Sequence, residues 1–131
     1  MKKKLKKKKL MNNQRTIKFR AWDKIDKTMC ISTSHIETWF EMKNRYELMQ
    51  FTGLLDKNGK EIYEGDLFRC IYYQDRHLDH IYEVNWNKHN AGFRLKRHGK
   101  ECLQIYVIQT MSDTSRNEII GNIYENPELL K

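Results

Sequence analysis

The string "FTGLLDKNGKEIYEGD", residues 51–66, constrains the fold of this chain more than any other feature. An apolar, β-prone run leads into "DKNG", and a shorter run follows before the next bend. Aspartate accepts hydrogen bonds from the backbone just after it, asparagine tolerates positive φ, and glycine adopts positive φ freely. The residues expected to form the two bends are Asp56, Asn58, Gly59, Gly65 and Asp66. The string therefore predicts a tight hairpin whose second strand leads directly into a third.

Several other segments alternate apolar and polar side chains, which is the period of a strand with one buried face. In residues 15–23, Ile17, Phe19 and Ala21 fall on one side and charged residues on the other. In residues 81–87 the side with Tyr82, Val84 and Trp86 is expected to be buried. Further strands are expected at residues 31–40, 67–73, 93–97 and 102–110.

Strands at intervals of 8–12 residues with turn residues between them predict a mainly β fold, either a small barrel or a sandwich. One such arrangement is an SH3-like core around residues 62–110. Short helical elements are also expected. One of them is a helical turn at Pro127, because a proline directly after Asn126 is typical of the start of such a turn. Residues 41–50 fit either a helical turn or the approach to a strand. Trp22, Trp39 and Trp86 are expected in the core.

The charge of the chain is concentrated at its N-terminus. The 131 residues carry a formal charge of +8, but seven of the 25 basic residues lie within residues 1–10, which leaves 18 against 17 acidic ones. A block of like charges repels itself and stays solvated. We therefore expect a Lys-rich tail at residues 1–10, with Met11 as an alternative natural start, and a single domain at residues 11–131.

The three cysteines, Cys30, Cys70 and Cys102, are an odd number at wide spacing, which is typical of free thiols in a reducing compartment. No apolar stretch approaches the ~20 residues that cross a bilayer, so no membrane association is expected. The predicted location is the cytoplasm.

Three blocks resemble the YopX family of bacteriophage and prophage proteins: "IKFRAWD", "LMQFTGLLDKNGKEIYEGD" and "IIGNIYENPELL". They follow the order of the family and span nearly all of residues 15–131, whereas residues 1–10 lie outside the resemblance. The resemblance implies a phage origin, a bacterial host and a mostly β fold. It implies no catalytic residue, because none is assigned to the family.

Sequence patterns of enzymes and metal sites are missing. The chain contains no nucleophile elbow, P-loop, zinc-protease helix or dinucleotide-binding glycine motif. Counted from Asp56, the sixth and twelfth positions of a calcium loop hold Glu61 and Leu67 instead of glycine and glutamate. His77 and His80 form one close pair, and we expect them to be solvated rather than to bind zinc. We predict no catalytic activity, no cofactor and no metal.

Two binding hypotheses remain. The first is contact with a protein partner, which tyrosine and tryptophan suit as anchors, with self-association through strand edges as a further alternative. The second is nucleic-acid binding by basic strand faces, with exposed aromatic rings as stacking platforms. The residues of these faces are Arg15, Lys18, Arg20, Arg94, Lys96, Arg97 and Lys100. Because the body carries a charge of only about +1, solubilising strand faces explain these residues better than nucleic-acid binding does, and we favour the protein partner.

Overall fold

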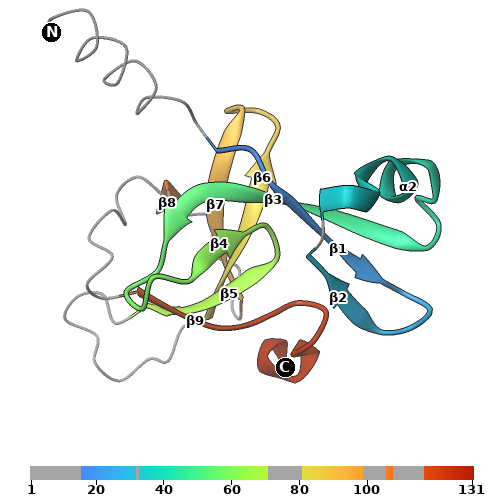
Figure 1. The fold of residues 1–131 in the computed structure, drawn as a ribbon. Coiled ribbons are helices and arrows are strands. Elements are labelled where there is room, and N and C mark those ends of the chain that lie inside the picture. The colour runs from blue at the N-terminus through green and yellow to red at the C-terminus, as the bar shows by residue number, and fades with distance from the viewer. Residues whose placement is uncertain (1–15, 32, 71–80, 99–105, 108–116) are drawn as a thin grey trace, which may run out of the picture.

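The computed structural model of the chain describes residues 16–31, 33–70, 81–98, 106–107 and 117–131 (Figure 1). These residues form two antiparallel sheets and three short helical segments. The mainly β fold with short helical elements that the sequence predicts is therefore confirmed. No helix in the described ranges is long and apolar enough to cross a membrane.

The first sheet has the strand order β2-β1-β3-β4. Its strands are β1 (Phe19–Asp23), β2 (Thr28–Cys30), β3 (Tyr46–Leu55) and β4 (Glu61–Tyr63). Ala21 of β1 lies opposite Cys30 of β2 and Leu48 of β3, so β1 runs through the middle of this sheet. The β3–β4 connection is the predicted hairpin, and Gly59 at its tip has φ +79°.

The second sheet has the strand order β8-β7-β6-β5-β9. Its strands are β5 (Asp66–Cys70), β6 (Ile81–Asn87), β7 (Gly92–Arg97), β8 (Tyr106–Val107) and β9 (Asn117–Asn122). The expected strands at 67–73 and 102–110 extend beyond the described residues, so only parts of them are seen. A 3-10 turn, η3 (Pro127–Leu130), follows β9 and confirms the helical turn predicted at Pro127.

The strand predicted at residues 31–40 is wrong. A 3-10 turn, η1 (Thr33–His35), and a short helix, α2 (Ile36–Glu41), occupy this part of the chain. Trp39 is the buried residue of α2, and the helix packs against β3. A single buried aromatic ring flanked by exposed neighbours fits one turn of helix as well as it fits a strand, so the local pattern could not decide between them.

The main apolar cluster lies on one face of the second sheet. Its members come from four strands of that sheet and from β4: Ile62, Phe68, Val84, Leu95 and Ile119. Each such side chain contributes roughly 1.5–3 kcal/mol on burial, which makes this cluster the chief apolar stabilisation of the second sheet.

The tryptophans follow the prediction in two cases out of three. Trp22 and Trp39 are buried, as expected, but Trp86 is 47% exposed. Trp86 does share a strand face with Val84, which is fully buried. It lies at the far end of β6, beside the turn, where the sheet no longer has cover on that face. Alternation correctly predicted that Val84 and Trp86 share a face of β6, but it could not show that burial on this face ends before Trp86.

The chain passes from the first sheet to the second at Gly65. This residue has φ +82°, in the region that favours glycine. Its N–H donates to the carbonyl of Val84, and its carbonyl accepts from the N–H of Ile123. One residue thus joins β4, β6 and the segment after β9, which places the two sheets against each other.

Candidate functional site

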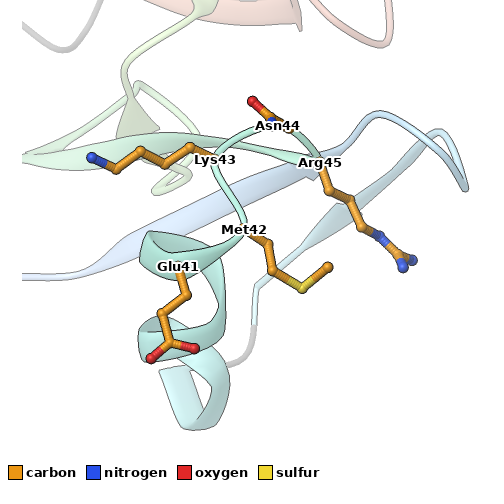
Figure 2. A pocket seen from close by; sticks show the side chains of 5 residues that line it. All are labelled: Glu41, Met42, Lys43, Asn44 and Arg45. Atoms are coloured by element: carbon orange, nitrogen blue, oxygen red, sulfur yellow. The ribbon is translucent and has the colours of Figure 1, made fainter.

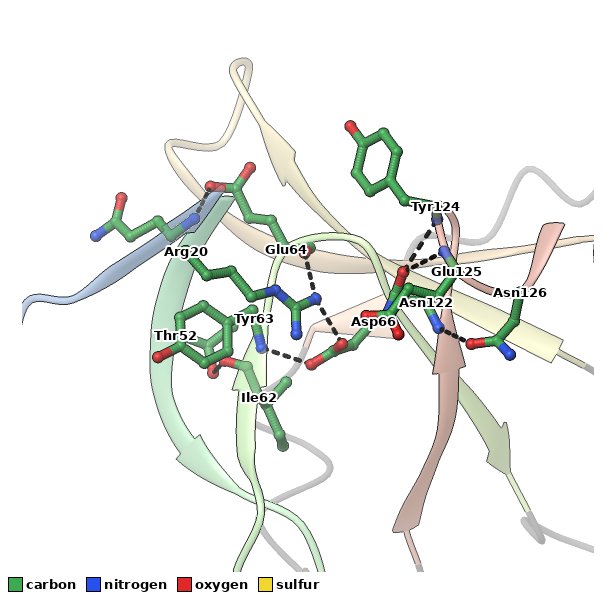
Figure 3. A network of polar contacts seen from close by, with 11 residues as sticks. Arg20, Thr52, Ile62, Tyr63, Glu64, Asp66, Asn122, Tyr124, Glu125 and Asn126 are labelled. Carbon is green, nitrogen blue, oxygen red and sulfur yellow. Dashed lines mark hydrogen bonds and ion pairs between the residues drawn. The ribbon is translucent and has the colours of Figure 1, made fainter. Parts of the chain in front are cut away.

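A buried ion pair crosses from the first sheet to the second. Arg20 of β1 donates through Nη2 to Oδ1 of Asp66 at 2.7 Å and to the carbonyl of Glu64 at 3.3 Å. Oδ2 of Asp66 accepts from the N–H of Tyr63 at 2.7 Å. Figure 3 shows the Arg20 guanidinium between these acceptors, and it also lies 4.7 Å from the centre of the Tyr63 ring.

Both side chains of this pair are shielded from water, with exposed fractions of 9% for Arg20 and 1% for Asp66. Burial raises the pKa of Asp66 above its ordinary value, and the nearby Arg20 charge limits the rise. Burial likewise raises the pKa of Glu64, although its carboxylate accepts from the N–H of Gln50. This network holds the sheets together. Arg20 is therefore not available to an exposed basic face, contrary to its place in the predicted set.

The predicted turn residues are structural. Oδ1 of Asp56 accepts from the N–H groups of Asn58 and Lys60, at 2.8 and 2.9 Å. Its Oδ2 accepts from the N–H of Ile119 in β9 at 3.2 Å. Burial works to raise the pKa of Asp56, but the three backbone donors prevail and lower it. The Asp56 carboxylate thus links the β3–β4 hairpin to the second sheet, although the sequence of the turn is polar.

The remaining predicted basic residues do not form one face. Lys18 pairs with Glu61, with its Nζ 2.9 Å from both carboxylate oxygens. Arg94 and Lys96 lie two residues apart on β7 and share one face of the sheet, whereas Arg97 lies on the other. Arg15 and Lys100 lie outside the described residues. Among the described members of the predicted set, Arg94 and Lys96 are the pair that the structure places on one exposed strand face.

The described residues contain no group of three or more histidine, cysteine or acidic side chains that could hold a metal ion. His77 and His80 lie outside them. One histidine–carboxylate pair is present: Nε2 of His98 lies 2.6 Å from Oε2 of Glu83. Cys30 is a free, half-buried thiol.

A shallow hollow of ≈ 320 Å³ follows helix α2 (Figure 2). The last residue of α2 and the four residues of the α2–β3 connection line it: Glu41, Met42, Lys43, Asn44 and Arg45. In Figure 2 the side chains of Met42 and Arg45 point to the same side of the connection. Because a single loop forms its walls, this hollow is a dent in the surface and not a substrate cavity.

Exposed apolar side chains gather on the elements of the first sheet. Of the seven large apolar residues that are highly exposed in the described part of the chain, six belong to that sheet, its connections or the residues just before β1: Ile17, Ile25, Ile31, Phe40, Met42 and Leu55. Phe40 is 50% exposed and Met42 44% exposed, beside the hollow. The Phe40 ring packs edge-on against Phe19 of β1, with 6.2 Å between ring centres. We call Phe19, Phe40 and Met42 the α2 surface.

The α2 surface was not expected from the sequence. In a strand over residues 31–40, Phe40 is only one of several alternating side chains. The available signal was the polar spacing around Trp39, with Glu37 and Glu41 four residues apart as on one side of a helix.

These features define a class: a small domain of two packed antiparallel sheets, with a buried Arg–Asp pair between them and no metal cluster among its described residues. The family model described as "YopX protein" matches residues 6–131, so the chain belongs to the YopX family. The match begins within the lysine-rich stretch, earlier than the motifs quoted above.

One solved structure shares this fold over nearly its whole length. It is the crystal structure of protein EF1440 from Enterococcus faecalis, which is 26% identical to this chain. The match has a TM-score of 0.60 and covers 90% of this chain and 100% of that chain. A comparison with curated proteins finds no significant match.

Proposed function

We propose that this YopX protein is a non-enzymatic binding or regulatory protein of a phage or prophage, and that it acts in the bacterial cytoplasm by contact with a protein partner. The observation that supports the proposal is the α2 surface, where Phe40 and Met42 are about half exposed beside the hollow. Host or defence machinery is the partner class we expect.

The chemistry of the α2 surface is that of a protein contact. Aromatic residues and methionine are enriched where proteins meet, and methionine adapts its shape to different partners. The polar residues around the apolar pair carry both signs of charge, with Glu37, Glu41 and Lys43 all exposed. An apolar centre with a mixed polar rim is the usual anatomy of an interface.

Site-specific photocross-linking in the host cell tests this proposal. We expect a photoreactive residue at position 40 to give a discrete cross-linked product, and one at the exposed Lys60 of the β3–β4 hairpin to give none. Met42→Ser should weaken the product from position 40 without affecting folding, because exposed substitutions usually change stability by less than about 0.5 kcal/mol.

The mass of the product identifies the kind of partner. A second copy of this chain would add 16.0 kDa, and such a product would replace the host-partner proposal with self-association. Equal products from positions 40 and 60, or none from either, would remove the α2 surface as the contact site.

A further inference from the structure

The tip of the β3–β4 hairpin carries a pair of residues with a chemistry of its own. Of the asparagines in the sequence, only Asn58 directly precedes a glycine, Gly59. Asparagine is among the chemically labile residues of proteins, and a following glycine leaves its amide unshielded because glycine has no Cβ. Both residues are exposed, and a Cβ added at Gly59 would meet nothing within 4 Å. Water and the reacting atoms therefore have room at this position.

The reaction open to this pair is loss of the asparagine amide as ammonia. The backbone nitrogen of Gly59 attacks Cγ of Asn58 and forms a new C–N bond, while the bond from Cγ to Nδ2 breaks. The proton of the attacking nitrogen leaves with the ammonia. Water then opens the five-membered imide at one of its two carbonyls, which leaves either aspartate or isoaspartate. The chain and water supply every atom of this reaction.

In the folded hairpin both reacting groups are engaged. The N–H of Gly59 donates to the carbonyl of Asp56 at 3.0 Å. Nδ2 of Asn58 donates to Oε1 of Glu118 at 3.3 Å. A nitrogen that donates its hydrogen to a carbonyl must lose this bond before it can attack. The docked hairpin therefore slows the reaction, and the tip has to open first.

The contacts that hold the tip on β9 lie at the surface of the molecule. In Figure 1 the tip lies beside the start of β9, where Glu118 is located. Nζ of Lys57 lies 3.2 Å from Oε2 of Glu118, and these side chains are 36% and 48% exposed. Exposed pairs contribute at most about 1 kcal/mol, and exposed tips open at a smaller free energy than the whole fold. The tip can thus open while the sheets stay packed.

We propose that Asn58 is a self-modification site, which deamidates when the hairpin tip leaves Glu118 and thereby weakens the return of the tip to β9. Aspartate at position 58 places a carboxylate where the amide now donates to the Glu118 carboxylate, and like charges repel. Isoaspartate also adds one backbone carbon to a turn whose geometry depends on Asp56. The site includes no residue of the α2 surface, so it stands or fails independently of the proposed function.

Peptide mapping of the full chain by mass spectrometry, after incubation at mildly alkaline pH, measures the rate at each asparagine. We expect product at Asn58 before any other asparagine, and faster formation in urea than in buffer. Glu118→Ala should speed the reaction in buffer about two- to fivefold, which corresponds to losing the ~0.5–1 kcal/mol of an exposed pair. Glu37→Ala, at an exposed residue of α2, makes the same change of charge and should behave as wild type.

Equal rates in these two variants, or in urea and in buffer, would overturn control of the reaction by the hairpin. Gly59→Ala tests the cyclic imide itself. The added Cβ shields the attacking nitrogen, so this variant should deamidate much more slowly at Asn58, even in urea. An unchanged rate in urea would contradict attack by the backbone nitrogen.

Hydrogen exchange tests the consequence for docking. The N–H of Ile119 in β9 donates to Oδ2 of Asp56, so its exchange reports the release of the hairpin. Asn58→Asp should speed this exchange about two- to fivefold, as expected for the loss of an exposed contact. Asn44→Asp, at an exposed asparagine of the α2–β3 connection, makes the same change of charge and should leave it unchanged. Equal exchange in the two variants would overturn the proposed weakening.

Discussion

Two arginine–aspartate pairs of the same length occupy different places in the molecule. Arg20 and Asp66 lie between the sheets, with Nη2 and Oδ1 2.7 Å apart. Asp23 is the last residue of β1 and Arg45 directly precedes β3, with Nη2 and Oδ2 also 2.7 Å apart. The side chain of Arg45 is 30% exposed, whereas that of Arg20 is 9% exposed.

The two aspartates respond in opposite ways to these surroundings. Burial raises the pKa of Asp66, despite Arg20. At the end of β1, the hydrogen bond from Arg45 lowers the pKa of Asp23 to about 2, helped by the N–H groups of Ile25 and Asp26. The length of an ion pair therefore does not decide its contribution to the stability of the fold, because the loss of hydration can exceed the attraction between the charges.

The largest expected effect comes from removing one partner of the buried pair. Arg20→Met leaves the Asp66 carboxylate buried without its counter-charge, which should cost about 3–5 kcal/mol of unfolding free energy. Arg45→Met should cost clearly less, because water reaches that site. Urea titration of both variants measures the difference, and equal losses would contradict the distinction between the pairs.

A smaller effect is expected beside the buried pair at Gly65. Gly65→Ala should cost about 1–2 kcal/mol, because an L side chain is disfavoured at φ +82°. Gly59→Ala is the matched control: its φ is +79°, and a Cβ there meets nothing within 4 Å. At Gly65 the Cβ would lie 3.4 Å from side-chain atoms of Ile123 and Met49. If Gly65→Ala lowers the unfolding free energy more than Gly59→Ala does, the difference measures the packing between the sheets at Gly65.

The smallest effect concerns acid stability at the Arg45–Asp23 pair, in which Arg45 is partly exposed. A carboxyl group with a lowered folded pKa stabilises the fold above its ordinary pKa of 3.8, and this contribution is lost as pH falls through about 2. Arg45→Met should return the pKa of Asp23 towards 3.8 and reduce the loss of stability between pH 4 and 2. NMR titration of the Asp23 side-chain carboxyl gives the pKa directly. A value that stays near 2 in the variant would assign the shift to the backbone donors alone.

Local pattern was sufficient where neighbouring residues decide the structure. The hairpin around Asp56 and Gly59 depends on side chain–backbone bonds within five residues, so its sequence specifies it. The turn at Pro127 is equally local. In contrast, helix α2 packs against β3 with Trp39 buried, and the alternation within residues 31–40 does not reveal that contact.

The basic residues likewise show what the local sequence predicts and what depends on tertiary contacts. Alternation placed Lys18 and Arg20 on one polar side of a strand. In the structure Lys18 lies just before β1 and Arg20 is buried, and they pair with Glu61 and Asp66, more than forty residues later. For Arg94 and Lys96, the alternation also gave the correct common face. The register of β6 and β7 places Glu83 directly across from Lys96, and only the contact between Glu83 and His98 shows that this carboxylate is engaged elsewhere.

By itself, the sequence determined the β character of the chain, its tight turns and its family, because periodicity, turn chemistry and motif order are properties of consecutive residues. The tertiary structure alone decided which charges are buried, which tryptophan is exposed and which apolar residues form the α2 surface. Those properties depend on contacts between segments that are distant in the sequence. Such a contact both removes water from a side chain and supplies its partner.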